Sequence, residues 1–500
     1  MLSHLSGSRP LTLRQLIPDG KFYGASDPIV VTCSDTVQRI VTGDVYFACI
    51  NADGDGHDDI LRAVELGAIA VVTERLVVTS VPVVVVTDSR RAFALACHQL
   101  FGLPSQSLTT TAVTGTDGKT TVAMLIESVL LNAGRDVTSR TSLGIRAPAG
   151  YAQRQTTPSA AELVGWLAKS IRWGVSNVIL EVDSRDVVSR RSTGTQFDHL
   201  VFTNISPAHL QLHRNAENYH RTLLGLIDQL KPNGVVIANV DDPVLRDILP
   251  KLEAPSLTYS MTDDTADIRA TLLERHRGEQ TFLLEVGHRS ALVRTRIIGD
   301  QHIRNCMAAT GIGLIQEIDL ATIVAGLEKL ERLNGRLDRV ECGQPFGVFV
   351  EHHVTPTRLA AALATLRSVT TGKLWCLYGP QTTRDDCQLA AMGRVIEVAA
   401  DHCILTGATH ETRGTLPLLH DVLDGMKHVG RPRIIPSRSR AVRWVLDEIG
   451  DDDTVLLIGA PITACPVEAC GQEDDRQLVE QHLREISDDA PVILPFPTAP

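Results

Sequence analysis

The sequence predicts an α/β protein of several domains, and two observations carry this prediction. Apolar, β-branched segments of strand length alternate with helical segments along most of the chain, as in sheets covered by helices. The chain has 500 residues, of which 43% are hydrophobic and 21% charged, so it is long enough for about two to four ordinary globular domains.

Composition and charge exclude several classes of protein. The formal net charge is −11 and no dense run of Lys and Arg occurs, which argues against a nucleic-acid or anionic membrane surface. The ten cysteines form no C-x-x-C pair, so we expect buried thiols in a reducing compartment rather than a disulfide scaffold or a zinc ribbon. The first residues lack the apolar core of a signal peptide, and the most apolar stretches have strand length. We expect a cytoplasmic protein without membrane insertion.

The first block of the chain predicts a small α/β domain. Strand-like segments occur at 29–33, 67–74 and 81–88, and a helical segment occurs at 58–67. The stretch 101–109 has the Gly, Pro and Ser content of a linker, so we expect a domain over residues 1–105.

The segment TAVTGTDGKTTVAMLIESVL, residues 111–130, predicts a phosphate-binding loop between a strand and a helix. Glycines there let backbone N–H groups surround an anion, and the helix dipole favours negative charge. Lys119 and Thr120 are suited to a phosphate and to the magnesium side of a nucleotide. The match to G-x-x-x-x-G-K-[ST] is incomplete because Val113 occupies the first glycine position, and an ordinary strand-to-helix turn is the alternative.

The second block predicts a parallel sheet over residues 106–340. Strand-like segments at 177–182, 199–205 and 234–242 are separated by helical stretches, as in βα units. Glu181 lies at the carboxyl end of the first of these strands, where parallel sheets place their ligands, so it is a candidate magnesium ligand. A surface carboxylate just past a strand is the alternative.

The third block, residues 341–500, predicts a doubly wound, Rossmann-like domain. Strand-like segments at 346–352, 373–379, 402–407 and 453–459 alternate with helices. From residue 471 the chain has one more helical segment and then a Pro-rich end.

Several motifs resemble those of the Mur ligase family. TGTDGKTT resembles its ATP loop, and residues 43–74 resemble the UDP-binding domain of the branch that adds the third peptide residue. TTPSAAEL, LEVDS, FTNISPAHLQLH, NGRLDRVE and LAAMGRVIEVAADHCILT stand in the order of that tripeptide synthetase branch. The resemblance implies a UDP-sugar-binding domain, a central ATP-binding domain and a C-terminal Rossmann-like domain.

The resemblance also implies an activity. It implies an ATP- and Mg²⁺-dependent amide-bond ligase that adds an amino acid to UDP-N-acetylmuramoyl-L-alanyl-D-glutamate in peptidoglycan precursor synthesis, acting as a monomer. In that chemistry a substrate carboxylate attacks the γ-phosphate, and the incoming amine displaces phosphate from the acyl phosphate.

Site residues follow from the resemblance position by position. Those implied to be catalytic are Lys119, Glu181 and His209, and those implied to hold magnesium are Thr120, Glu181 and His209. The implied nucleotide-binding residues are Gly115, Thr116, Asp117, Gly118, Lys119, Thr120, Thr121 and Arg336. The implied dipeptide-binding residues are Thr156, Thr157, Ser184 and Arg191. For Arg336, an exposed hinge arginine is the alternative.

The sequence departs from the family at several positions. Leu223 stands where the family has a lysine that becomes carbamylated, and Ala208 replaces the aspartate before His209. Val354 replaces a histidine near the nucleotide, and the stretches 408–411 and 459–463 lack the family's amino-acid-binding motifs. If the missing carbamate limits activity, Leu223→Lys should raise it in bicarbonate buffer.

Two further hypotheses remain beside the working ligase. The first is a degenerate relative that binds nucleotide without ligating and has a regulatory or assembly role. The second is a folylpolyglutamate-type ligase, which the resemblance at residues 43–74 disfavours.

Overall fold

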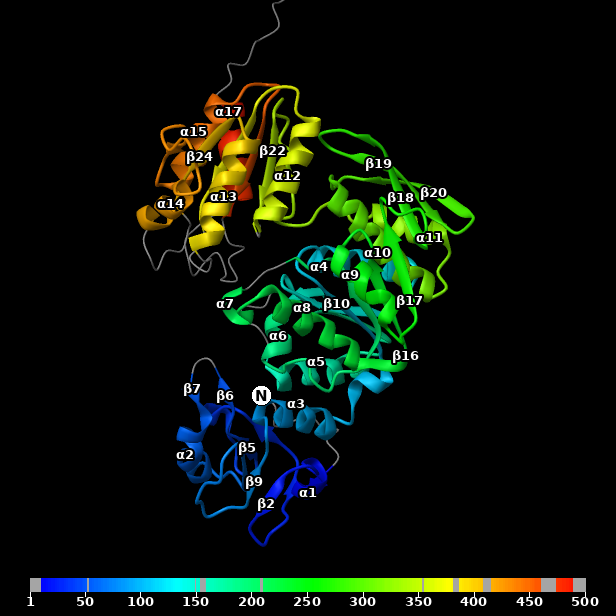
Figure 1. The fold of residues 1–500 in the computed structure, drawn as a ribbon, viewed down its shortest axis with the longest axis vertical. Coiled ribbons are helices and arrows are strands. Elements are labelled where there is room, and N and C mark those ends of the chain that lie inside the picture. Colours follow the sequence, from blue (N-terminus) through cyan, green and yellow to red (C-terminus); the bar gives the residue numbers. More distant parts are fainter. Residues whose placement is uncertain are drawn as a thin grey trace, which may run out of the picture. The chain divides into compact units, whose positions relative to one another are not determined.

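The computed structural model describes residues 10–51, 54–148, 150–152, 159–206, 210–352, 355–380, 386–407, 415–459 and 474–488 (Figure 1). The chain divides into two compact units. The first comprises Met1–Arg269 and Cys306–Gly326, and the second comprises Ala270–Asn305 and Leu327–Pro500. No helix within the described ranges is both long and apolar enough to cross a bilayer.

The first unit begins with a five-stranded sheet, which contains the strands predicted for the first block. Its order is β2 (Lys21–Tyr23), β9 (Val83–Val85), β8 (Ala70–Thr73), β5 (Val45–Phe47) and β4 (Cys33–Ser34). Helix α3 (Ser89–Leu100) packs on this sheet through Phe93, whose ring lies 5.3 Å from that of Phe47. The smaller elements are β1 (Leu11–Thr12), α1 (Leu13–Leu16), β3 (Ile29–Val30), β6 (Ile50–Asn51), β7 (Gly54–Asp55) and α2 (Ile60–Glu65).

The central sheet of the first unit confirms the predicted parallel strands. Strands β11 (Val137–Thr141), β14 (Asn177–Glu181), β10 (Thr109–Thr114), β15 (Phe197–Phe202), β16 (Leu230–Asn239) and β17 (Ser256–Ser260) pair in parallel in this order. Strands β12 (Gly144–Ala147) and β13 (Gly150–Ala152) add an antiparallel edge that the βα pattern did not predict. Two residues join β11 to β12 and two join β12 to β13, which is enough for a hairpin and too few for a parallel crossover.

Parallel pairing places three strand ends side by side at one edge of the sheet. In the register, Val113 of β10 stands opposite Glu181 of β14, and Thr114 of β10 stands opposite Phe202 of β15. The chain segments that follow β10 and β15 therefore meet next to Glu181.

Helices of the first unit cover this sheet. They are α4 (Lys119–Asn132), α5 (Ala160–Arg172), α6 (Ser184–Val188), α7 (Leu210–His213), α8 (Ala216–Leu224) and α9 (Pro243–Ile248). Two further helices, α10 (Asp300–Ile315) and α11 (Leu320–Glu328), contribute residues to both units. Helix α11 contacts α4 closely, because Ser128 Oγ donates a hydrogen bond of 2.6 Å to the Gly326 carbonyl.

The second unit contains a hairpin that the sequence did not predict. Strand β18 (Ile268–Arg275) begins in the first unit, and β19 (Gln280–Val286) and β20 (Arg289–Thr295) pair antiparallel along their whole length. Gly287 in the two-residue turn has φ +58°, a value that a hairpin turn of this type needs and that glycine adopts readily.

The remaining sheet of the second unit is doubly wound, as predicted. Its order is β21 (Asp338–Val340), β22 (Gly347–Glu351), β26 (Thr454–Ile458), β23 (Leu374–Tyr378), β24 (His402–Leu405) and β25 (Arg433–Ile434), with only β21 antiparallel. Two separate apolar clusters involve its helices. The first includes α12 (Pro356–Val369), α13 (Asp386–Ala399) and α14 (Thr415–Leu423), and the second includes α15 (Arg438–Glu448) and α17 (Asp475–Asp488).

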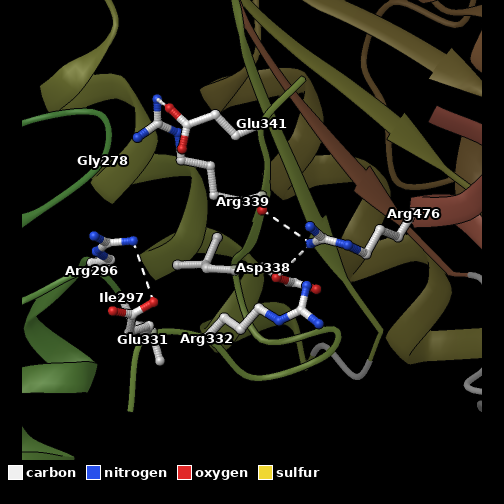
Figure 2. Close-up of a pocket in the computed structure, with 10 residues that line it drawn as sticks. Gly278, Arg296, Ile297, Glu331, Arg332, Asp338, Arg339, Glu341 and Arg476 are labelled. Atoms are coloured by element: carbon white, nitrogen blue, oxygen red, sulfur yellow. Dashed lines mark hydrogen bonds and ion pairs between the residues drawn. The ribbon is translucent and has the colours of Figure 1, made fainter. Parts of the chain in front are cut away.

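A charged pocket in the second unit contains none of the predicted site residues (Figure 2). Its four arginines face three acids, and most of these charges pair with one another. Arg476 Nη1 lies 3.0 Å from Asp338 Oδ1, and Arg296 Nη1 lies 3.3 Å from Glu331 Oε2. The pocket therefore satisfies much of its own charge.

Gly326→Ala should destabilise the first unit by about 1–3 kcal/mol, because the added Cβ would lie 2.6 Å from Val129 Cα, a backbone atom of α4. The midpoint of urea unfolding measures the change. Gly225→Ala is the matched control, since a Cβ there meets no atom within 4 Å, and its midpoint should stay the same or rise slightly. Equal midpoints for the two variants would contradict the close contact.

His98 in α3 should make the stability of the first unit depend on pH. Burial lowers the pKa of His98 from 6.5 to about 4, and its Nε2 lies 3.3 Å from Thr195 Oγ1. In the unfolded chain His98 takes up a proton below about pH 6.5, whereas in the folded chain it does so only below about pH 4. The free energy of unfolding therefore falls as the pH drops from about 6.5 to 4, by up to about 3 kcal/mol.

The His98→Gln variant tests this dependence through urea midpoints between pH 7.5 and 4.5. Its midpoint should fall less steeply with decreasing pH than that of the unmodified protein. Parallel curves for the two proteins would assign the pH dependence to other groups.

Candidate active site

The phosphate loop has the backbone conformation that its glycines predict. Gly115, directly after β10, has φ +133°, and Gly118, directly before α4, has φ +87°. A Cβ on Gly115 would lie 2.2 Å from Thr203 Oγ1 and 2.7 Å from the Asn204 carbonyl oxygen. Only glycine fits at this contact, because both the left-handed φ and the lack of space exclude a side chain.

Residues after β15 hold the loop in place. Thr203 Oγ1 and Asn204 Nδ2 donate to the Asp117 carbonyl at 2.6 and 2.9 Å, and the Asp117 N–H donates to Asn204 Oδ1 at 3.0 Å. Sequence reasoning missed these two residues, although they belong to a segment that resembled the family. Their position at the end of the strand next to β10 was the available signal.

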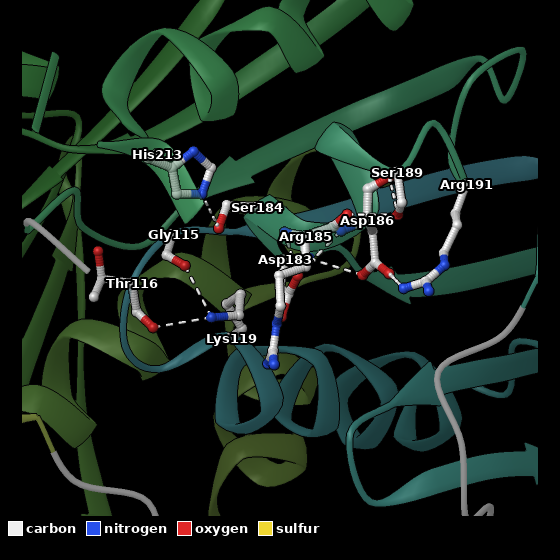
Figure 3. Close-up of polar contacts among 10 residues, drawn as sticks. All are labelled: Gly115, Thr116, Lys119, Asp183, Ser184, Arg185, Asp186, Ser189, Arg191 and His213. Carbon is white, nitrogen blue, oxygen red and sulfur yellow. Dashed lines mark hydrogen bonds and ion pairs between the residues drawn. The ribbon is translucent and has the colours of Figure 1, made fainter. Parts of the chain in front are cut away.

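Lys119 is folded back onto its own loop (Figure 3). Its Nζ donates to the carbonyl oxygens of Gly115 and Thr116, each at 2.9 Å. The predicted nucleotide-binding residues Gly115, Thr116, Asp117, Gly118, Lys119, Thr120 and Thr121 thus form one continuous turn from β10 into α4. An ammonium bonds more strongly to a phosphate than to neutral carbonyls, so an incoming phosphate can compete for Lys119.

Thr120 and Glu181, the predicted magnesium ligands, are in direct contact. Thr120 Oγ1 donates to Glu181 Oε2 at 3.0 Å, and the Ser142 N–H donates to the same oxygen at 2.8 Å. A hydroxyl and a carboxylate are hard oxygen donors, which fit Mg²⁺ when water and phosphate oxygens complete its shell. Among the described residues no cluster of three His, Cys, Asp or Glu side chains could hold a metal, and His209 lies outside those residues.

Acidic and basic side chains alternate at the start of α6, next to Lys119. The side chain of Asp183 caps α6, and its Oδ2 accepts from Arg185 Nε at 3.1 Å. Burial opposes ionisation of Asp183, but the charges of Arg185 and Lys119 outweigh it and lower its pKa. Burial and the charge of Asp183 raise the pKa of Asp186 to about 6.

The predicted dipeptide-binding residues fall into two groups. Ser184 and Arg191 belong to α6 and the segment after it, where Arg191 Nη1 lies 3.4 Å from Asp186 Oδ1. Ser184 is buried, and its Oγ lies 2.9 Å from His213 Nε2. Burial lowers the pKa of His213, although Asp183 acts in the opposite direction. Thr156 and Thr157 lie outside the described residues.

Helix α8 presents an apolar residue where the family resemblance implied a lysine. Leu223 is 0% exposed and belongs to the same apolar cluster as Leu200, Phe202 and Leu226. Tyr219, one turn earlier, places its hydroxyl 2.9 Å from Thr116 Oγ1 of the phosphate loop. The helix therefore supports the loop through Tyr219 and completes the core through Leu223. Ala208 lies outside the described residues.

Arg336 of the second unit is not an exposed hinge residue. It is 7% exposed, and its Nη1 lies 3.8 Å from Glu351, which also pairs with Arg358 at 3.2 Å. Gly335 precedes it with φ +63°, and a Cβ there would overlap the ring of His352. Val354 and the stretches 408–411 and 460–463 lie outside the described residues.

Comparisons with known proteins relate the chain to one family. The profile described as Mur ligase middle domain matches residues 113–313, and the profile described as Mur ligase, glutamate ligase domain matches residues 335–461. The UDP-N-acetylmuramoyl-L-alanyl-D-glutamate--2,6-diaminopimelate ligase of Geobacillus kaustophilus (strain HTA426) is 31% identical over 462 residues, which cover 90% of this chain and 93% of that protein.

Solved structures share the fold. A UDP-N-acetylmuramoyl-L-alanyl-D-glutamate--2,6-diaminopimelate ligase has a TM-score of 0.69 at 23% identity and covers 96% of this chain and 100% of its own. The MurF ligase from Thermotoga maritima in complex with ADP has a TM-score of 0.62 at 19% identity and covers 91% of this chain and 98% of its own.

A glycine-rich loop at the carboxyl edge of a parallel sheet, with a lysine and a Thr–Glu pair beside it, defines a phosphate-binding α/β protein. The extent and identity of the matches specify the class further. The chain belongs to the Mur ligase family.

Leu223→Lys should destabilise the first unit by more than about 3 kcal/mol, because it buries an ammonium in an apolar core. This expectation replaces the gain in activity that the sequence suggested. Urea unfolding measures the loss, and Arg221→Lys is the control, since the Arg221 side chain on the same helix is 71% exposed. A stable Leu223→Lys protein with raised activity in bicarbonate would contradict this expectation, because the lysine side chain would then reach the active site without disrupting the core.

Proposed function

We propose that this protein is an ATP-dependent ligase that joins an amino acid to UDP-N-acetylmuramoyl-L-alanyl-D-glutamate in peptidoglycan precursor synthesis. The observation that carries the proposal is the phosphate loop with Lys119 at its end and the Thr120–Glu181 contact beside it. The name of the relative that is 31% identical over 90% of this chain supports the choice of substrate.

The proposed reaction has two steps. A substrate carboxylate attacks the γ-phosphorus of ATP, ADP leaves, and an acyl phosphate forms. The amine of the amino acid then attacks the acyl carbon, phosphate leaves, and the nitrogen loses a proton. Both steps bring anionic oxygens together, so catalysis depends on fixed positive charge and hydrogen-bond donors at that place.

The residues of the phosphate loop provide these groups. Lys119 exchanges its two carbonyl partners for phosphate oxygens. The N-terminal end of α4 favours the same anion through its backbone N–H groups and its dipole. Thr120 and Glu181 hold Mg²⁺, which neutralises phosphate charge when it is bound. His209 is the proposed third metal-site residue, and Lys119, Glu181 and His209 form the proposed catalytic set.

The other assignments extend the proposal to the rest of the chain. Residues 1–105 bind the UDP-sugar, residues 106–340 bind ATP, and residues 341–500 form the third domain. Arg336 contacts the nucleotide, and the dipeptide is bound by Thr156, Thr157, Ser184 and Arg191. The stretch from Ala408 to Glu411 lacks the family's motif for binding diaminopimelate. We therefore propose either a different amino acid as the substrate, or diaminopimelate that is recognised through other contacts.

We further propose that the protein acts in the cytoplasm, where ATP is available, and as a monomer.

A second candidate function is nucleotide binding without ligation, in a regulatory or assembly role. The observation that favours it is Leu223, whose complete burial leaves no metal-binding group at that position of α8. The ligase is the better-supported function, because Lys119 lies in the phosphate loop and Thr120 contacts Glu181, an arrangement that suits phosphate and magnesium.

The test is phosphate release from ATP in the presence of UDP-N-acetylmuramoyl-L-alanyl-D-glutamate and single amino acids, with products identified by mass. Release together with a tripeptide product supports the ligase and names its amino acid. ATP binding without any product supports the second candidate.

Lys119→Ala should lower the rate of phosphate release by about two to three orders of magnitude, because it removes the positive charge nearest the transferred phosphoryl group. Lys251→Ala, which removes an exposed lysine after α9, is the control and should leave the rate unchanged. Undiminished nucleotide affinity and rate in Lys119→Ala would overturn the assignment of the phosphate loop.

A further inference from the structure

A buried hydrogen bond joins Ser184 to His213 beside the phosphate loop (Figure 3). Ser184 is the first residue of α6 and 2% exposed, and His213 is the last residue of α7 and 4% exposed. Ser184 Oγ and His213 Nε2 lie 2.9 Å apart, so one of the two atoms donates a proton to the other. The direction of this bond decides what Ser184 can offer to a ligand.

The second nitrogen of His213 determines that direction. Nδ1 lies 3.4 Å from Thr222 Oγ1, and the same hydroxyl lies 2.7 Å from the Asn218 carbonyl oxygen. A hydroxyl has one proton, and a carbonyl oxygen can only accept, so the shorter contact uses the Thr222 proton. A hydrogen bond between Nδ1 and Thr222 Oγ1 therefore requires the ring proton on Nδ1, with Nδ1 as the donor.

A neutral imidazole has only one N–H, so His213 Nε2 is the acceptor. Ser184 consequently donates its single proton to Nε2. Ser184 Oγ keeps two lone pairs, with which it can accept a hydrogen bond from a ligand. It has no second proton to donate to one.

The imidazole ring is held in this orientation by its surroundings. Tyr219 packs its ring against it at 5.2 Å with an interplanar angle of 75°, and Asn218 Nδ2 donates to the His213 carbonyl at 3.1 Å. Thr116 Oγ1 donates to the Ser206 carbonyl at 2.7 Å, so the Tyr219 hydroxyl donates to Thr116 and is fixed as well. The ring is thereby tied to the phosphate loop.

The hydrogen bond to His213 also decides which ligand group suits Ser184. A substrate carboxylate on Ser184 Oγ would meet only oxygen lone pairs, whereas an N–H group would find an acceptor there.

We propose that His213 is a positioning residue that makes Ser184 an acceptor only, and that Ser184 binds the acceptor substrate through a peptide N–H and not through a carboxylate. This inference rests on the proposed function. It assigns to Ser184 a specific class of contact, and to His213 a role that follows from the Thr222 hydroxyl and the Asn218 carbonyl.

Ester analogues of the substrate test the proposal. Two analogues of UDP-N-acetylmuramoyl-L-alanyl-D-glutamate are used. In the first, oxygen replaces the N–H of the amide before alanine, and in the second, oxygen replaces the N–H of the amide before glutamate. Calorimetry measures the dissociation constants of the amide and of both esters, without ATP turnover. The unmodified protein should bind one of the esters about tenfold or more weakly than the amide.

Variants assign this preference to the Ser184–His213 pair. Ser184→Ala and His213→Leu should both reduce the ratio of ester to amide dissociation constants towards 1 for that analogue, as in a double-mutant cycle. A purely structural role for His213 would weaken binding of all ligands alike and leave the ratio unchanged. Ser184→Ala removes a single oxygen atom, so it keeps the test valid if His213→Leu fails to fold.

His199→Leu is the matched control. His199 is also a buried histidine of the first unit, with Nδ1 3.1 Å from Thr111 Oγ1, but it belongs to β15 within the sheet. Its removal should leave the ratio unchanged. The inference is overturned if Ser184→Ala keeps the ratio of the unmodified protein for both esters. If the unmodified protein binds none of the three ligands while it still binds ATP, the proposed substrate is wrong and the inference falls with it.

Discussion

The contact between the loop after β10 and the residues after β15 is the constraint on which the site depends. Gly115 approaches Thr203 and Asn204 so closely that no side chain fits, and these two residues then hold the backbone of Asp117. Without this support the loop N–H groups and Lys119 would have no fixed direction. Parallel pairing of β10 with β15 and β14 creates the contact, because it aligns the carboxyl ends of all three strands.

Helix α8 connects the phosphate loop with the apolar core and with His213. Its buried face presents Tyr219 to the loop and Leu223 to the core, and the Tyr219 ring makes a T-shaped contact with His213. Burial raises the pKa of Tyr219 to about 12, so its hydroxyl stays protonated and serves as a donor. One helix face thus combines packing with hydrogen bonding, and a charged group at Leu223 would conflict with the packing.

The charged residues at the start of α6 influence one another's pKa values. Asp183 interacts with Lys119 on one side and with Arg185 on the other, and its charge contributes to the raised pKa of Asp186. A change in any one of these groups alters the charge that the others experience. Effects of substitutions among them should therefore not add, and pairs of variants are needed to separate their contributions.

The sequence by itself determined the α/β class, the strand-to-helix position of the phosphate loop and the choice of Thr120 and Glu181, which the structure brings into contact. These are local features, since they depend on periodicity, on glycine and on the end of a strand. Only the tertiary structure decided that Thr203 and Asn204 clamp the loop, that β12, β13, β19 and β20 run antiparallel, that Arg336 is buried, and that His213 meets Ser184. Each of these joins residues that strand pairing or side-chain packing brings together, and no local pattern encodes which distant partner a side chain meets.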